Sequence, residues 1–316
     1  MESAVVRRQL ALMERVRRLP PDQPFTSGSA TEVGLTYEML RQLVQLGVLC
    51  HPVRGVYYPA GIPDSLELRV AMLKLVVPPG AVATDRTAAW LWGAQRVLAP
   101  GAHLEIPPIS MFCLPGSRLR NKLVESGQRM LLPADTEMVD GVRVTTPLRT
   151  ACDVGRLLHR DQAIGVLDAL AALDRFDLPQ LLVETARFRG FRGVLQLRYL
   201  APLVDKRSGS PGESTLRLRW LEVPLPRPEC QVPVCGPDGR SFFVDIGLPD
   251  RRFGAEYFGE EFHGEDQREH DENRLSWVRG RERWTITVAR KQNVYGAEQD
   301  VDGLLIADAR LCGLLP

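Results

Sequence analysis

The sequence of 316 residues contains no apolar run that approaches the ~20 residues needed to cross a membrane. Its N-terminus carries several arginines, but no apolar stretch followed by a cleavage site, so no signal peptide is indicated. There is no internal repeat and no low-complexity tract. We therefore expect a cytoplasmic protein without membrane contacts.

Cysteine and lysine are both used sparingly. The six cysteines form no C-x-x-C pair, which argues against a zinc ribbon and favours free thiols in a reducing compartment. The net charge of +1 excludes a polycationic chain, although it leaves room for a local basic face. Four of the 40 basic residues are lysine and the others are arginine, which suits bidentate contacts to phosphate and guanine. The alternative explanation for the excess of arginine over lysine is high-GC codon usage.

The first informative segment predicts a helix, a turn, a second helix and a hairpin. Thr36 is typical of a helix N-cap, and Gly47 is typical of a helix end. Short strands are predicted at 48–50 and 56–58, with Arg54 at the tip of the turn between them. This is the order of elements in a winged helix-turn-helix, a fold whose second helix enters the DNA major groove.

The helix that follows Thr36 is amphipathic. Its core side is expected to consist of Met39, Leu40, Leu43 and Leu46. Its outer side carries residue types that can contact bases or phosphates, and these are Thr36, Tyr37, Glu38, Arg41, Gln42 and Gln45. The expected partner is double-stranded DNA, with Arg54 reaching a phosphate or the minor groove. A small protein-interaction domain with ordinary polar faces is the alternative.

The first half of the chain resembles AbiEi-type antitoxins, the repressor-like members of type IV toxin–antitoxin pairs. The residues that carry the resemblance are Gly34-Leu35-Thr36, Arg54-Gly55-Val56-Tyr57-Tyr58, Arg86-Thr87-Ala88-Ala89-Trp90-Leu91-Trp92-Gly93 and Thr146-Pro147-Leu148-Arg149-Thr150-Ala151-Cys152-Asp153. The resemblance implies repression of its own operon through DNA binding. It also implies a cognate toxin as a partner of the middle region, where helices are expected at 147–158, 162–173, 179–187 and 194–200.

A second informative segment predicts a hairpin that carries two acids. The strands 241–248 and 253–258 flank a turn at Pro249, so that facing residues have numbers summing to 501 and Asp245 lies opposite Glu256. Two carboxylates held this close need a cation between them, and Mg²⁺ is the usual one. Such a site can activate water against a phosphodiester. A solvent-exposed sheet surface is the alternative, which the apolar neighbours of both acids disfavour.

The order of elements from Pro211 to Ala289 resembles the very-short-patch-repair endonuclease group of the PD-(D/E)XK superfamily. The resemblance makes Asp245 and Glu256 metal ligands, with Glu213 as the helix acid and His263 as a general acid or base. It makes Asp271 and Arg274 a supporting helix pair. One departure weakens it: Phe258 occupies the position of the superfamily's lysine.

We therefore expect three domains in an α+β and α/β multidomain chain. They are a winged helix-turn-helix domain at 1–62, a mixed α/β antitoxin-like domain at 63–206 and a restriction-endonuclease-like α/β domain at 207–316. Two functions remain open. One is a Mg²⁺-dependent DNA endonuclease in toxin–antitoxin or phage-defence context, and the other is a non-catalytic antitoxin and transcriptional repressor with a degenerate nuclease domain. The sequence does not indicate an oligomeric state.

Overall fold

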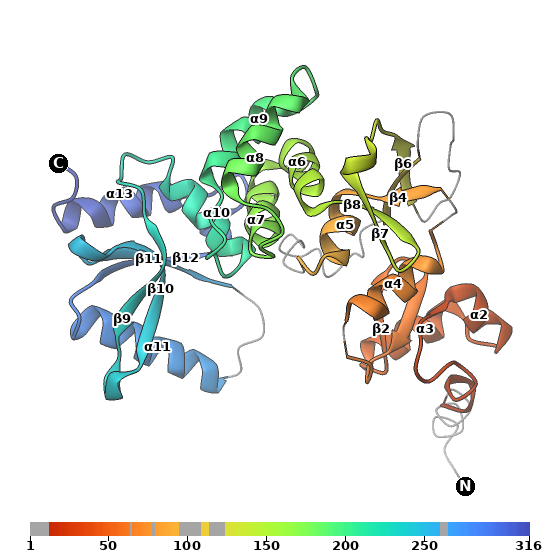
Figure 1. Ribbon diagram of the computed structural model, residues 1–316. Coiled ribbons are helices and arrows are strands. Elements are labelled where there is room, and N and C mark those ends of the chain that lie inside the picture. Colours follow the sequence, from red (N-terminus) through yellow and green to blue (C-terminus); the bar gives the residue numbers. More distant parts are fainter. Residues whose placement is uncertain (1–12, 64, 78–79, 95–108, 114–123, 260–264) are drawn as a thin grey trace, which may run out of the picture. The chain divides into compact units, whose positions relative to one another are not determined.

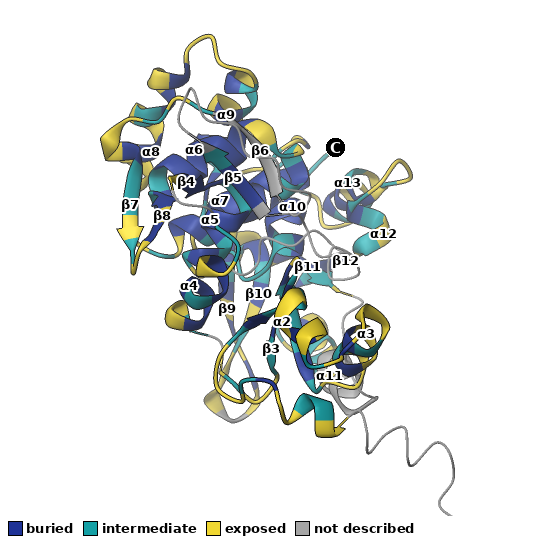
Figure 2. Ribbon diagram, turned by 90° about the vertical axis from the view of Figure 1, so that its right-hand side faces the viewer, coloured by how far each residue is buried: buried dark blue, intermediate teal, exposed yellow. Residues whose placement is uncertain are grey.

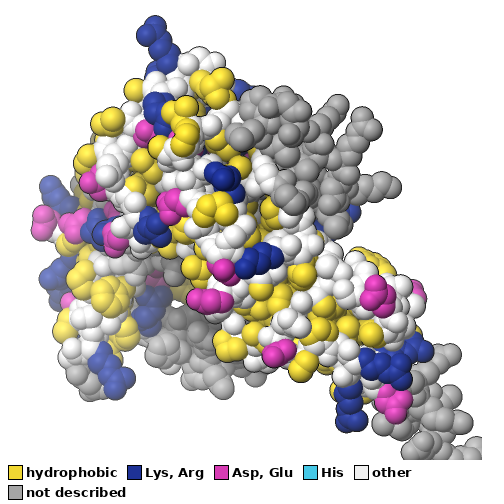
Figure 3. Space-filling view, turned by 45° about the vertical axis from the view of Figure 1, so that its right-hand side comes forward, with side chains coloured by type: hydrophobic (Ala, Val, Ile, Leu, Met, Phe, Trp, Pro, Cys, Tyr) yellow, Lys and Arg dark blue, Asp and Glu magenta, His cyan; other side chains and the backbone are white. Residues whose placement is uncertain are grey.

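The computed structural model divides the chain into two compact units. The first comprises residues 1–93 and 101–150, and the second comprises 94–100 and 151–316. The residues described are 13–63, 65–77, 80–94, 109–113, 124–259 and 265–316. Figure 1 follows the chain from end to end. On the face drawn in Figure 3, acidic and basic side chains are interspersed, in keeping with the balanced charge.

The N-terminal part of the first unit packs two short helices on a small sheet. The sheet has the strand order β1-β3-β2, and all of its pairs are antiparallel. The Thr36 hydroxyl accepts the Met39 N–H at 3.3 Å, which caps the second helix as the sequence predicts. The elements are β1 (Phe25–Thr26), α2 (Ser27–Glu32), α3 (Tyr37–Gln45), β2 (Leu49–Val53) and β3 (Val56–Pro59).

The rest of the first unit is a mixed sheet in the order β6-β5-β4-β8-β7. Strand β4 pairs antiparallel with β5 and parallel with β8, and helices α4 and α5 supply much of the core. The Trp92 indole donates to the Thr145 carbonyl at 2.8 Å, which ties the end of α5 to β8. The elements are α4 (Leu66–Lys74), β4 (Ala81–Ala83), α5 (Asp85–Leu91), β5 (Ile109–Cys113), β6 (Val124–Gln128), β7 (Thr136–Val139) and β8 (Val142–Thr145).

Helix α6 (Pro147–Leu157) runs from the first unit into the second, where a helical layer follows. Gln196 donates through its amide to the carbonyls of Gly155 and Leu158, at 2.8 and 2.9 Å, and so satisfies the end of α6. The layer consists of α7 (Arg160–Ala171), α8 (Leu178–Glu184), the 3-10 helix η3 (Thr185–Phe188), α9 (Val194–Leu200) and the 3-10 helix η4 (Ala201–Leu203). These helices lie close to their predicted positions.

The second unit also contains a sheet with helices on both faces (Figure 1). Its order is β12-β11-β10-β9, with β11 and β12 parallel and the other pairs antiparallel. One face packs with α10 and α13 around Trp220 and Phe253, and the other packs with α11 around Val278 and Trp284. The elements are α10 (Pro211–Trp220), β9 (Glu229–Cys235), β10 (Ser241–Leu248), β11 (Phe253–Phe258), α11 (Glu265–Gly280), β12 (Thr285–Arg290), α12 (Lys291–Val294) and α13 (Val301–Leu311).

Helices α7 and α10 are joined by two buried ion pairs. Arg217 binds Asp168 at 2.7 Å, and Arg219 binds Asp161 at 2.6 Å. All four side chains are at most 9% exposed. Both helices are buried along most of their length in Figure 2. The helical layer and the four-stranded sheet are therefore parts of one core.

The mixed α/β fold class is confirmed. The predicted boundary at 206/207 falls between α7 and α10, which belong to one compact unit, whereas the contacts divide the chain at 150/151. The residues just after the predicted boundary belong to the helical unit, since the Ser210 hydroxyl caps α10 by accepting the Glu213 N–H.

Two glycines of the second unit provide a test of its packing. Gly193 has φ +76°, and an added Cβ would lie 1.8 Å from the Arg156 carbonyl oxygen. Gly190 has φ +81° but no atom within 4 Å of such a Cβ. We expect Gly193→Ala to lower the unfolding free energy by more than ~3 kcal/mol and Gly190→Ala by only about 1–2 kcal/mol. Urea unfolding measures both, and equal losses would contradict this packing.

Candidate functional site

The acid-bearing hairpin has the predicted register. Ile246 faces Ala255 and Leu248 faces Phe253, so that facing residues sum to 501. The strands are joined by the 3-10 turn η6 (Pro249–Arg251). The paired part of the ladder ends at Ile246 and Ala255, the residues next to Asp245 and Glu256.

Asp245 lies just beyond the last backbone pair between β10 and β11. Its Oδ2 accepts the Tyr257 backbone N–H at 2.7 Å, so that the carboxylate replaces a strand carbonyl. Burial, followed by repulsion from Glu213 and Glu256, raises the pKa of Asp245 well above its usual range. A carboxyl group that resists ionisation in this way is characteristic of functional sites.

The strands β9 and β10 change faces together at Asp245. Val232 and its partner Val244 pack under α11, whereas Cys230 and its partner Ile246 pack under α10. The residue between Cys230 and Val232 is Gln231, which has φ +53°. Because side chains in a regular strand alternate, this switch requires a local distortion of both strands. Gln231 and Asp245 face each other at that point.

Glu213 occupies the first turn of α10. Its Oε2 accepts the Gly209 N–H at 2.7 Å and the Gln231 side-chain amide at 2.8 Å. An added Cβ on Gly209 would lie 2.8 Å from both carboxylate oxygens, so the loop before α10 is closely fitted to this acid. Gln231, which the sequence analysis missed, therefore connects Glu213 to the strand that faces Asp245. Its position opposite Asp245 was readable from the strand register.

Glu256 is neutralised by Arg274. The guanidinium group donates to both carboxylate oxygens, at 2.9 and 2.6 Å, and also to the Phe243 carbonyl at 3.2 Å. Glu256 is only 1% exposed. The sequence paired Arg274 with Asp271. Asp271 lies in α11, but its side chain is outside the described part, as is the whole of His263.

The donor set does not fit a divalent cation. Both oxygens of Glu256 bind a guanidinium group, and Glu213 is held by two N–H donors. Phe258, half-buried at the end of β11, has no polar side-chain atom where the superfamily has lysine. In the ranges that the structure describes, no three His, Cys, Asp or Glu side chains are placed to hold a metal ion.

The second candidate site is the outer side of α3. Every residue predicted to face outward is exposed, namely Thr36, Tyr37, Glu38, Arg41, Gln42 and Gln45. Leu40 and Leu43 are buried and Met39 is half-buried. The prediction for Leu46 is wrong, because its side chain is 64% exposed. Leu46 is the C-cap, and Gly47, at φ +68°, turns the chain away immediately afterwards.

Arg54 lies exposed at the tip of the β2–β3 hairpin. The next residue, Gly55, donates its N–H to His51 Nε2 at 3.2 Å, and the His51 ring stacks on Tyr57 at 4.0 Å between centroids. Burial lowers the pKa of His51 to about 4, so the imidazole is neutral and able to accept this bond at physiological pH. The tip that carries Arg54 is thus held by a side chain that the sequence analysis overlooked.

Comparison with known proteins identifies the central region. Residues 81–203 match the AbiEi antitoxin C-terminal domain. The uncharacterized proteins Rv2248 and MT2308, from two strains of Mycobacterium tuberculosis, are each 34% identical to the chain over 254 residues, which cover 80% of the chain and 89% of the relative. The chain belongs to the family of these two proteins. None of its described helices is long and apolar enough to span a membrane.

Several charged residues within the matched region have structural roles. Arg149, from the stretch around Thr146, pairs with Asp135 at 2.7 Å, and both side chains are at most 4% exposed. Asp85, at the start of α5, binds the guanidinium of Arg129 through both oxygens at 2.7 and 3.0 Å. That guanidinium also lies 3.9 Å from the Phe112 ring centroid. These ion pairs fix the sheet of the first unit.

The Glu256–Arg274 pair yields a prediction about stability. Arg274→Gln leaves a buried carboxylate without its counter-charge, so we expect a loss of about 3–5 kcal/mol in unfolding free energy. The double variant Glu256→Gln/Arg274→Gln removes both charges and should recover at least half of that loss. Urea unfolding of the two single variants and the double variant measures the coupling. Equal stability of Arg274→Gln and the native protein would contradict the pair's role.

Proposed function

We propose that the protein is a DNA-binding regulator of the antitoxin type. The observation that carries this proposal is the exposed polar row of α3 beside the Arg54 hairpin tip, in a chain that contains an AbiEi antitoxin C-terminal domain. The helix–turn–helix–hairpin order supports a winged helix-turn-helix, with α3 as the recognition helix. Arg41 and Gln42 would read base edges, and Arg54 would contact a phosphate.

A cognate toxin is the second proposed partner. The matched antitoxin domain supports this, and its helical layer exposes apolar side chains of a kind that normally contact another protein. Among the described residues of α8 to α9, those that are exposed are Leu178, Leu182, Val183, Phe191, Leu195 and Tyr199.

We further propose that the C-terminal part has a nuclease-like arrangement without nuclease activity. The sheet order, the acid on α10 and the acids on the neighbouring strands β10 and β11 support the resemblance to very-short-patch-repair endonucleases. The raised pKa of Asp245 is the one observation that favours retained chemistry. Against it stand the guanidinium on Glu256 and the side chain of Phe258. A Mg²⁺-dependent DNA endonuclease is accordingly the second candidate.

The proposed role of α3 and of the Arg54 hairpin tip in DNA recognition is tested by DNA binding. We expect Arg41→Ala to weaken binding to the DNA upstream of the protein's own coding region about tenfold to a hundredfold, because a side chain that reads a base contributes about 1–3 kcal/mol. Arg54→Ala should weaken binding to all sequences to a similar degree. Arg143→Ala, which removes an exposed arginine from β8 of the same unit, is the matched control. Full affinity and selectivity in both test variants, measured by fluorescence anisotropy, would contradict the assignment.

The absence of catalysis is tested directly with supercoiled and linear DNA. We expect neither to be cut in Mg²⁺, Mn²⁺ or EDTA, because no free carboxylate pair is available to bind the ion. Gel electrophoresis reads the result, and Asp245→Ala is run beside the native protein. Metal-dependent nicking that disappears in Asp245→Ala would establish the endonuclease instead.

A further inference from the structure

Several buried or half-buried arginines of this protein are paired with a carboxylate. In five such pairs the guanidinium lies 2.6 to 2.7 Å from a carboxylate oxygen. They are Arg149–Asp135, Arg156–Asp153, Arg217–Asp168, Arg219–Asp161 and Arg274–Glu256. In these five pairs the carboxylate neutralises the guanidinium group, as the cost of burying a lone charge requires.

One end of the four-stranded sheet differs. Five exposed arginines gather there, two in the β10–β11 turn and three around the end of α11 and the turn into β12. We call this set the arginine end, and it consists of Arg251, Arg252, Arg279, Arg281 and Arg283. No carboxylate pairs with any of these five among the residues that the structure describes. Asp250 and Glu282 are the acids within the same two turns.

The two turns are held side by side. Strands β11 and β12 run parallel, with Phe253 opposite Thr285, so the turns that precede them lie at the same edge of the sheet. The Thr285 N–H donates to the Arg252 carbonyl at 2.8 Å, and the Arg252 guanidinium donates to the Glu282 carbonyl at 3.2 Å. Arg279 donates to the Ile286 carbonyl at 2.6 Å. These hydrogen bonds to backbone carbonyls hold the two turns, and with them the five arginines, close together.

Two of these arginines also occupy strained backbone positions. Arg252 has φ +48° and Arg283 has φ +56°, in the left-handed region where glycine or asparagine is favoured. A residue with a Cβ costs roughly 1–2 kcal/mol there. Strain of this kind, at two adjacent turns, is typical of positions selected for what the side chain does.

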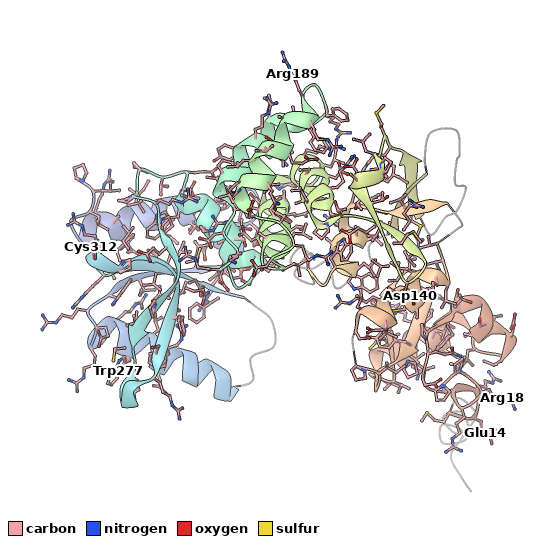
Figure 4. The ribbon with its side chains drawn as sticks, viewed as in Figure 1. Glu14, Arg18, Asp140, Arg189, Trp277 and Cys312 are labelled. Carbon is pink, nitrogen blue, oxygen red and sulfur yellow. The ribbon has the colours of Figure 1, made fainter. Side chains whose placement is uncertain are left out.

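We propose that the arginine end binds the phosphate backbone of double-stranded DNA. Guanidinium groups bind phosphate oxygens bidentately. Arginines that are held close together without carboxylate partners repel each other, and a polyanion relieves this repulsion. DNA also releases its bound counterions when such arginines contact its phosphates, which favours binding. Trp277 lies near the end of α11 (Figure 4). The Arg281 guanidinium lies 6.0 Å from the centroid of its ring, in a cation–π contact. This proposal rests on the proposed function for the choice of DNA as the polyanion.

The site is distinct from the acid site. Glu256 lies three residues along β11 from Phe253, and its carboxylate faces α11 through Arg274. A contact at the arginine end reads no bases, since it involves side chains on turns rather than an element that could enter a groove. It would add affinity that does not depend on sequence, whereas α3 would supply selectivity.

The test removes three arginines whose side chains make no hydrogen bond among the described residues. The variant is Arg251→Gln/Arg281→Gln/Arg283→Gln in the full-length protein. Arg252 and Arg279 are kept because they fasten the two turns. The matched control removes three exposed arginines from the helical layer of the same unit, as Arg189→Gln/Arg192→Gln/Arg198→Gln. Arg189 points away from the helices at the turn before α9 (Figure 4). Both variants have the same net charge.

Binding is measured by anisotropy, as a function of salt, on two duplexes of equal length: the DNA upstream of the coding region and a scrambled duplex. We expect the test variant to lose about tenfold or more on both duplexes, and its slope of log K against log salt to fall by roughly one per arginine removed. The control variant should match the native protein. Circular dichroism and thermal unfolding establish that both variants are folded.

Equal binding by the test and control variants would overturn the proposal, whether both bind like the native protein or both lose affinity through net charge alone. A loss confined to the upstream duplex would also overturn it, because a backbone contact is blind to sequence. Failure of the proposed function is a separate result. It would appear as equal binding of the two duplexes by the native protein, together with no effect of Arg41→Ala on selectivity.

Discussion

The second unit depends on the two buried ion pairs that join α7 to α10. Arg217 and Arg219 are two residues apart on α10, and their partners Asp168 and Asp161 are two turns apart on α7. Arg217 also donates to the carbonyl of Leu203 at the end of the helical layer. Each buried charge is acceptable only while its partner is present, because a lone one would cost several kcal/mol. The pairs therefore hold α10 against α7 while its other side packs on the sheet.

The position of α10 affects the β10–β11 hairpin, because Glu213 on α10 contributes to the raised pKa of Asp245. The carboxylates of Asp245 and Glu256, on neighbouring strands, experience different environments, because the sheet has a different helix on each side. Glu256 receives the Arg274 guanidinium of α11, whereas Asp245 receives the Tyr257 backbone N–H and the field of Glu213 on α10. The same scaffold that could have held a cation between two acids instead satisfies them separately, from opposite faces.

Local patterns in the sequence predicted local structure well. The cap at Thr36, the exposed row on α3 and the pairing of Ile246 with Ala255 and of Leu248 with Phe253 all follow from short-range patterns. What could not be read was which distant side chains meet. The contact of Arg274 with Glu256 on the sheet is one example, because the two residues are 18 positions apart in the sequence. The predicted boundary at 206/207 was likewise misleading, since the Ser-Gly-Ser-Pro sequence that follows it suits a helix N-cap as well as a flexible loop.

The hairpin tip of the first unit illustrates how a binding surface can be ordered in advance. Many loops gain their bound shape only on contact, and the lost backbone freedom then subtracts from affinity. Here the Gly55 N–H and the His51 ring, stacked on Tyr57, already define the turn. Immobilising the Arg54 side chain is then the main entropic cost of a contact, about 0.5–1.5 kcal/mol. The hairpin thus combines an ordered backbone with one exposed, flexible side chain, that of Arg54.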